Sequence, residues 1–295
     1  MLFFNQDSRG LRVTYPDPAF PVICRLVTFS GIADNCRQTC WHEDVVLIQN
    51  LTKPLVFRVY TDDVVLEAGD ILLVNSAQLH SCRSDDPAGC FRAFLFHPEL
   101  LRGLLESDHP FYRRIEDRGL RFVRWPACSR QAQILRPLLE CVDEQGTADA
   151  ARRLEMISLA CLSAAFFCDA PASVSTATHR ERRDEDAVHA MLACLVRSYG
   201  EKLSLDLIAE EAGVSRSKCC KLFGALVGTT PMDYLSSLRL GIAAWMLSHT
   251  DLSIRVIAQR CGFPEQSYFT RLFKARYHCT PGRCRKSADE SKKTA

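Results

Sequence analysis

Short runs of branched and aromatic residues alternate with chain-breaking residues in the first hundred positions. The clearest runs cover residues 22–29, 45–51, 55–60 and 71–74. Gly31, Pro54 and the pair Gly69-Asp70 lie between them. Branched and aromatic residues favour strands, and several short strands at close spacing are typical of a barrel or sandwich. The pattern therefore predicts a small β-barrel.

The spacing of apolar residues becomes helical over residues 129–168. Two apolar runs at helical spacing, separated by Gly146, predict an antiparallel helix pair. We interpret this pair as dimerisation helices, since an apolar helix pair beside a small barrel needs a partner surface. The alternative is that both helices pack on their own barrel. Residues 169–186, rich in Ala, Ser, Thr and mixed charges, predict a linker, and helical patterns follow from Ala187 onward.

The C-terminal third of the chain contains an internal repeat. Residues 203–213 (LSLDLIAEEAG) recur as residues 252–262 (LSIRVIAQRCG), an offset of 49 positions. Further along, Leu222-Phe223 matches Leu272-Phe273, and Thr230-Pro231 matches Thr280-Pro281, with an offset of 50. The second copy therefore carries one extra residue after its glycine.

Each copy has the signals of a helix-turn-helix. Ser204 and Ser253 are placed to cap the first helix of each copy. Gly213 and Gly262 suit the left-handed conformation that ends such a helix, and a short turn containing glycine joins the two helices of this motif.

A long helix is predicted between the two copies. Thr230 is a suitable cap with Pro231 in the first turn, and the apolar pattern continues to about His249. Such a helix would hold two recognition helices about 34 Å apart, which matches successive major grooves on one side of DNA.

Residues 203–285 resemble the AraC/XylS family of transcription regulators. The most specific matches are Asp251-Leu252-Ser253-Ile254, Ile257-Ala258, Gly262-Phe263, Gln266-Ser267-Tyr268-Phe269, Arg271-Leu272-Phe273-Lys274 and Thr280-Pro281. The resemblance implies tandem helix-turn-helix units that bind double-stranded DNA. It also implies which residues face DNA: Ser217, Cys220 and Lys221 on the first recognition helix, and Gln266, Ser267, Thr270 and Arg271 on the second.

The chemistry of these positions agrees in part with DNA reading. Arginine pairs with guanine edges and glutamine with adenine edges, while lysines hold phosphates without reading sequence. Cys219 and Cys220 depart from the polar residues expected on the first recognition helix, so we expect the second helix to dominate specificity. For any single residue, the alternative is a solvated surface position.

Two N-terminal segments, residues 40–44 (CWHED) and 66–81 (LEAGDILLVNSAQLHS), look like the cupin-type segments of many AraC-family sensor domains. The resemblance implies that His42 and His80 point into the barrel, and that these two and Glu43 bind a small-molecule effector. The alternative is that they pack without a ligand. Metal-binding cupins use more ligands than are visible, so we expect neither a metal nor a cofactor.

Charge and cysteine content refine this interpretation. Residues 1–185 have a net charge of −4 and residues 186–295 a net charge of +6, so only the C-terminal part is expected to meet a polyanion. The 15 cysteines are odd in number and follow no secretion signal, so we expect free thiols that pack as small hydrophobic groups. The alternative is a thiol- or metal-responsive switch that uses Cys36 or Cys40.

Several classes of protein are disfavoured. No apolar run approaches the roughly 20 residues of a membrane helix, and the N-terminus does not read as a secretion signal, so we expect a cytoplasmic protein. No nucleophilic triad, phosphate loop or carboxylate pair stands out, so we expect no enzyme. The alternative is a cupin enzyme fused to a DNA-binding module.

These observations together predict an α+β chain. A cupin-like β-barrel with a helical dimerisation pair covers residues 1–168, a linker 169–186, an all-α domain with two helix-turn-helix units 187–287, and a disordered tail 288–295. The predicted function is sequence-specific DNA binding by a transcription regulator that responds to a small molecule. A homodimer is the expected assembly, with RNA polymerase as a further partner.

Overall fold

The computed structural model describes residues 4–7, 10–13, 15–29, 39–117, 119–141, 150–171 and 179–286. The chain divides into two compact domains: an N-terminal one that ends at Arg182, and a C-terminal one that consists mainly of the residues from Arg183 onward and also includes Gln6, Asp7 and Gly10. Each domain has its own hydrophobic core. Within the described ranges, no helix combines the length and hydropathy needed to cross a bilayer.

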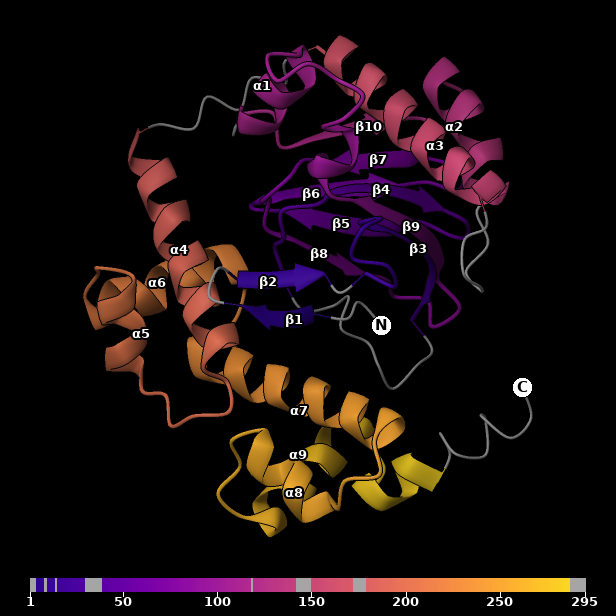
Figure 1. The fold of residues 1–295 in the computed structure, drawn as a ribbon. Coiled ribbons are helices and arrows are strands. Elements are labelled where there is room, and N and C mark those ends of the chain that lie inside the picture. Colours follow the sequence, from indigo (N-terminus) through magenta and orange to yellow (C-terminus); the bar gives the residue numbers. More distant parts are fainter. Residues whose placement is uncertain are drawn as a thin grey trace. The chain divides into compact units, whose positions relative to one another are not determined.

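Antiparallel sheets form most of the N-terminal domain (Figure 1). One sheet has the order β10-β7-β4-β9-β3 and consists of β3 (Val22–Thr28), β4 (Val45–Asn50), β7 (Ile71–Val74), β9 (Cys90–Phe96) and β10 (Phe122–Trp125). A second has the order β6-β5-β8 and consists of β5 (Leu55–Val59), β6 (Asp62–Leu66) and β8 (His80–Arg83). β1 (Phe4–Asp7) and β2 (Gly10–Val13) form a separate pair. The predicted β-rich N-terminal domain is confirmed.

The inner strands β4 and β7 of the five-stranded sheet are buried on both faces, which explains why they read as continuous apolar runs. All six residues of β4 are buried. On one face, Val45 and Leu47 belong to a core shared with helices. Successive strand residues point to opposite faces, so Val46 and Ile48 point to the other side. There the two sheets meet, because the rings of Phe57 on β5 and Phe91 on β9 lie 5.2 Å apart.

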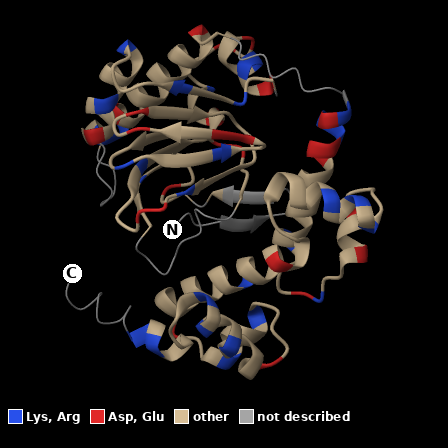
Figure 2. Ribbon diagram, turned by 180° about the vertical axis from the view of Figure 1, so that it is seen from behind, with Lys and Arg blue, Asp and Glu red and all other residues tan. Residues whose placement is uncertain are grey.

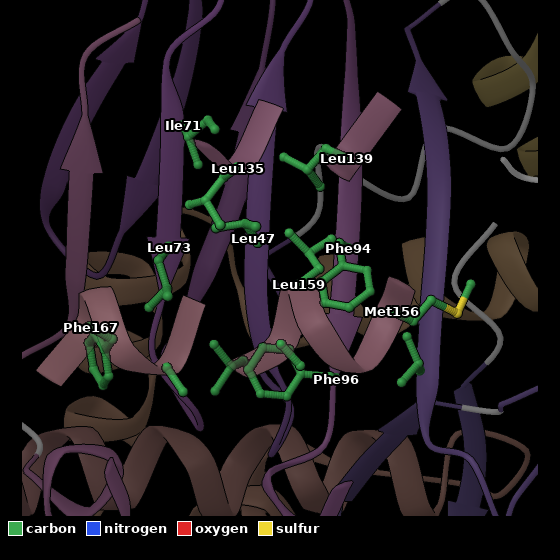
Figure 3. Packing of buried hydrophobic residues seen from close by; sticks show 14 of the residues in the cluster. Leu47, Ile71, Leu73, Phe94, Phe96, Leu135, Leu139, Met156, Leu159 and Phe167 are labelled. Atoms are coloured by element: carbon green, nitrogen blue, oxygen red, sulfur yellow. The ribbon is translucent and has the colours of Figure 1, made fainter. Parts of the chain in front are cut away.

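The predicted helix pair is present and packs on its own sheet. It consists of α2 (Arg130–Cys141) and α3 (Ala150–Asp169), while a short 3-10 helix, η2 (Pro98–Leu101), and α1 (Pro110–Glu116) precede them. Figure 3 shows residues from both helices facing the strands: Leu135, Leu139, Met156, Leu159 and Phe167 against Leu47, Ile71, Leu73, Phe94 and Phe96. Burying each such side chain contributes about 1.5–3 kcal/mol. The main apolar faces of the pair are thus used within the domain; Gly146, the predicted turn, lies outside the described residues.

From Arg183 onward, the described part of the C-terminal domain is formed by helices (Figure 1). They are α4 (His179–Arg197), α5 (Leu205–Glu211), α6 (Arg216–Val227), α7 (Pro231–His249), α8 (Ile254–Arg260) and α9 (Gln266–Tyr277), followed by a helical turn at 281–286. The predicted tail at 288–295 lies outside the described residues.

α4 begins earlier than the sequence pattern predicted. Its first eight residues, 179–186, were expected to be linker because all of them are polar or charged. They continue the helix of the buried residues Val188, Met191 and Leu195, which recur at helical spacing. Glu181 also lies in the first turn, where the helix dipole favours a negative charge. The polar composition of residues 179–186 therefore gave no indication that the helix begins there.

Candidate nucleic-acid interface

The first helix-turn-helix consists of α5 and α6. The Ser204 side chain caps α5 by accepting a hydrogen bond from the Leu207 amide. At the other end, Gly213 has a φ of +64°, and the Val214 amide donates to the Ala209 carbonyl at 2.9 Å. This left-handed ending turns the chain toward α6, as the sequence predicted.

α6 has one face in the core and one face outside. Cys219 and Phe223 are buried, and the Cys219 sulfur lies 3.7 Å from the Met191 sulfur of α4. Burial raises the pKa of the Cys219 thiol, which therefore stays protonated. The three positions expected to face DNA are all exposed: Ser217, Cys220 and Lys221. They are spaced by three and four residues, so they share one helical face.

The second helix-turn-helix, α8 and α9, repeats this construction with a longer turn. Five residues, 261–265, separate its helices, whereas four, 212–215, separate α5 from α6. The extra residue is the one that the repeat offset predicted. Gly262 has a φ of +73° and ends α8 as Gly213 ends α5.

α9 also separates a buried face from an exposed one. Phe269 and Phe273 are fully buried. Of the positions expected to face DNA, Gln266, Ser267 and Arg271 are exposed, and Thr270 is half-buried. Three of the four thus lie on accessible surface, and Thr270 is accessible in part.

The charges on the two recognition helices differ. On α6, the Arg216 Nε lies 3.2 Å from an Asp206 carboxylate oxygen, and the Lys218 Nζ lies 2.8 Å from an Asp184 carboxylate oxygen. On α9, the Arg271 guanidinium lies over the Tyr268 ring at 5.3 Å. It has no carboxylate partner within the described part of the chain.

The positive charge of the C-terminal domain is visible on its helices, where Lys and Arg outnumber Asp and Glu (Figure 2). Sequence analysis did not identify Asp184 as the partner of Lys218. The partner lies on a helix whose beginning was read as linker.

A single helix, α7, runs between the two helix-turn-helix units, as predicted. The Thr230 hydroxyl caps it by accepting from the Asp233 amide at 3.1 Å, and Pro231 occupies the first turn. At 1.5 Å per residue, a helix of this length spans about 28 Å. Its contacts with α6 and α8 connect it to both units.

In the N-terminal domain, two of the three predicted effector residues lie together. The rings of His42 and His80 meet edge to face with centroids 5.0 Å apart. The His42 Nδ1 lies 3.2 Å from the Asp44 carboxylate, which also accepts a hydrogen bond from the Tyr15 hydroxyl. Burial disfavours the charged form of Asp44, but the contacts with His42 and Tyr15 outweigh it, so the pKa of Asp44 is lowered.

Glu43 lies apart from the histidine pair. It is exposed, and its carboxylate lies 3.6 Å from the His97 Nε2. His42 and Asp44 are both buried and in contact, whereas Glu43 between them is exposed.

The second histidine of the pair is held as a neutral ring. The His80 Nδ1 lies 2.8 Å from the Gln78 carbonyl oxygen, so this nitrogen donates. The Nε2 is then the acceptor, and the Cys40 sulfur lies 3.7 Å from it. Burial, with the neighbouring His42 charge, lowers the pKa of His80 to about 3. At neutral pH the ring therefore carries no charge.

Comparison with known proteins agrees with this division of the chain. Residues 54–160 match the family described as AraC-like ligand binding domain, and residues 208–287 match a helix-turn-helix domain. The transcriptional regulator YdeC of Bacillus subtilis is 22% identical over 88% of this chain and 90% of its own length. ExsA of Pseudomonas aeruginosa is 35% identical over 94 residues, which cover 32% of this chain and 34% of ExsA.

A crystal structure of ToxT from Vibrio cholerae aligns with a TM-score of 0.45 and 14% identity, over 90% of this chain and 95% of ToxT. The match to ExsA spans about a third of that relative's length, and the match to YdeC spans nearly all of it. The ligand-binding match precedes the helix-turn-helix match in this chain, in the order expected of a sensor followed by a DNA reader. The chain belongs to the AraC family of transcription regulators.

Proposed function

We propose that this regulator grips double-stranded DNA with both helix-turn-helix units and changes transcription when a small molecule binds its N-terminal domain. The observation that carries the DNA part is the division of each recognition helix into a buried apolar face and an exposed polar face. An exposed helix face of this kind fits the major groove.

We assign two roles to the exposed residues. Arg271 and Gln266 have the side chains that read guanine and adenine edges, while Lys221 holds a phosphate. Ser217, Cys220, Ser267 and Thr270 complete the proposed contact set by fitting against the groove. Because two cations of α6 are paired with carboxylates, the second recognition helix contributes more of the base reading.

In vitro selection of DNA from a random pool with the full-length protein tests this proposal. We expect a recurring motif in two parts, centred about one helical turn, or 34–36 Å, apart. Footprinting on the selected DNA should show protection on one side of the duplex. Selected sequences without a shared motif would contradict the proposal.

The effector site is proposed around His42, His80 and Glu43. His42 is only 1% exposed, and its Nε2 has no hydrogen-bond partner among the residues that the structure describes. An unpaired buried polar group costs about 1–3 kcal/mol, which a polar ligand atom would recover. His80 is already paired at both nitrogens. The Glu43 side chain could contact the ligand only if its ion pair with His97 were broken.

Thermal-shift titration with panels of small polar metabolites tests the effector site. We expect one class of compound to raise the melting temperature of the wild-type protein and change its DNA affinity. The shift should be lost in His42→Phe and kept in Arg58→Gln, a control change on the β5 surface. A ligand that stabilises His42→Phe as well as wild type would place the effector elsewhere.

We also infer a homodimer that uses the outer face of α3. Leu154 on this face is 64% exposed, although the rest of the helix pair packs on its own sheet. Sedimentation should show a dimer for wild type and a monomer for Leu154→Glu. We further propose that the protein contacts RNA polymerase, is located in the cytoplasm and catalyses no reaction. The support for these three points is its similarity to the AraC family.

A thiol-responsive regulator is the alternative that one contact favours. The Cys40 sulfur lies beside the His80 Nε2, but an imidazole with a pKa of about 3 is a weak base for a thiol. Cys36 lies outside the described residues. Selective modification of Cys40 by dilute hydrogen peroxide, with loss of DNA binding that Cys40→Ser prevents, would favour this alternative.

A further inference from the structure

One arginine on the long helix connects the two helix-turn-helix units. Arg239, on α7, donates from its Nε to the Tyr199 carbonyl at 2.7 Å and from its Nη2 to the Glu201 carbonyl at 2.6 Å. These carbonyls belong to the segment between α4 and α5, at the edge of the first helix-turn-helix. The same guanidinium lies 5.9 Å from the Phe263 ring, in the turn of the second. We call this set the bridging contact.

Two glycines let the backbones approach closely at the bridging contact. A Cβ on Gly262 would lie 2.7 Å from the Tyr199 carbonyl oxygen and 2.8 Å from the Arg239 Nη2. A Cβ on Gly200 would lie 2.9 Å from the Arg260 carbonyl oxygen. Such distances are below normal contact, so any side chain at either position would push the two units apart.

The equivalent glycines of the two repeat copies can be compared at this close approach. Gly213 occupies the place in the first unit that Gly262 occupies in the second, and both have a positive φ. A Cβ on Gly213 would meet nothing within 4 Å. Backbone conformation therefore requires glycine in both copies, whereas the bridging contact requires it only in the second.

The bridging contact is partly shielded from water: Arg239 and Tyr199 are half-buried, whereas the hydrogen bond to Glu201 lies at the surface. Desolvation lowers the pKa of Arg239, although the guanidinium stays charged. Burial raises the pKa of the neighbouring Cys261 thiol to about 12, so it stays neutral. Hydrogen bonds from a charged donor are stronger than those between neutral groups, and Arg239 donates two of them. The contact is thus suited to resisting rotation between the units.

We propose that Arg239 is a positioning residue that sets the relative orientation of the two recognition helices, and with it the spacing between the two DNA segments that are read. The inference rests on the proposed DNA binding. α7 connects the two units through the chain itself. The bridging contact adds a second, non-covalent connection between them. If the two units are already held at the spacing of the DNA segments, binding DNA does not require them to lose freedom of rotation relative to each other, so the entropy cost of binding is lower.

The test uses DNA duplexes in which the two parts of the selected motif are moved apart by one or two base pairs. One inserted base pair shifts the second part by about 3.4 Å and rotates it by roughly 35°. We expect wild-type affinity to fall on the order of 10-fold or more for one insertion. For Arg239→Ala, the fall should shrink to about 3-fold or less, with affinity for each separate half of the motif unchanged.

Two further variants separate positioning from general loss of structure. Arg239→Lys should be intermediate, since an ammonium group lacks the two-pronged geometry of guanidinium. Gly262→Ala should relax the spacing preference, whereas Gly213→Ala, which introduces similar backbone strain without a close contact, should keep it. Circular dichroism checks that each variant retains its helices.

The outcomes distinguish the inference from the function on which it rests. If wild type prefers no motif, the proposed DNA reading fails. If wild type reads both halves but Arg239→Ala keeps the full spacing preference, DNA reading stands and the role of Arg239 is overturned. Equal loss of spacing preference in Gly213→Ala and Gly262→Ala would also overturn it.

Discussion

The two helix-turn-helix units share a repeated sequence but differ in how their recognition helices begin and in what surrounds their charges. α6 starts with Ser215, whose side chain accepts a hydrogen bond from the Lys218 amide. α9 starts with Glu265, which makes no such capping bond. Lys218 is held by Asp184, whereas Arg271 lies over the Tyr268 ring. The first helix is thus better anchored, and the second keeps more positive charge available.

The cores of the two units also differ, in the residues that close them. The first closes against α4, where Met191 meets Cys219. The second is built around an aromatic group in which the rings of Phe263, Phe269 and Phe273 lie in succession. Duplication preserved the apolar spacing that makes each unit fold. Groups outside the repeat, on α4, account for much of the difference between the surfaces.

The largest expected effect tests the cores. Phe273→Ala empties the centre of the aromatic group, so we expect the free energy of unfolding to fall by about 3–5 kcal/mol. Urea denaturation followed by fluorescence would measure it. Phe223→Ala is the matched change in the first unit and should cost less, because α4 can move toward the space. A larger loss of unfolding free energy in Phe223→Ala than in Phe273→Ala would contradict this expected difference between the cores.

The next effect tests which helix reads bases. Arg271→Ala should weaken binding to the selected motif by about 1–3 kcal/mol and relax preference at one base pair. Lys221→Ala should weaken binding about equally for all sequences and lower the salt dependence by about one ion. Titrations against single-base variants at several salt concentrations separate these outcomes. An unchanged sequence preference in Arg271→Ala would refute the assignment to α9.

A smaller effect tests the helix starts. Ser215→Ala removes a capping bond from α6 and should reduce stability by about 0.5–2 kcal/mol. Glu265→Ala removes no capping bond from α9, so the expected change is smaller. Thermal unfolding of the two variants side by side provides the measurement. Equal losses would mean that the caps do not distinguish the units.

The smallest effect concerns the ion pair between α4 and α6. Asp184→Asn should change stability by less than about 1 kcal/mol, because Lys218 is half exposed. It should also free Lys218 for a phosphate and steepen the salt dependence of DNA binding by about one ion. Asp251→Asn, which removes an exposed charge beside the second unit, is the control. An equal response in both variants would show that net charge alone is responsible.

Much of this fold is predictable from local patterns. The repeat offsets of 49 and 50 predicted that the second turn is longer by one residue, and Thr230-Pro231 marked the start of α7. The three residues proposed to bind the effector do not all meet in the structure, because Glu43 lies apart from His42 and His80. The beginning of α4 was missed, since eight polar residues resemble a linker until their buried continuation is known.

The sequence by itself determined the order of the strands and helices it identified and the two DNA-reading units, because periodic spacing and caps act over a few neighbouring residues. Only the tertiary structure decided the partners: Asp184 for Lys218, the Tyr199 and Glu201 carbonyls for Arg239, and Asp44 for His42. Most of these pairs lie tens of residues apart along the chain. They meet because burial brings distant segments together, and local patterns contain no record of which segments those are.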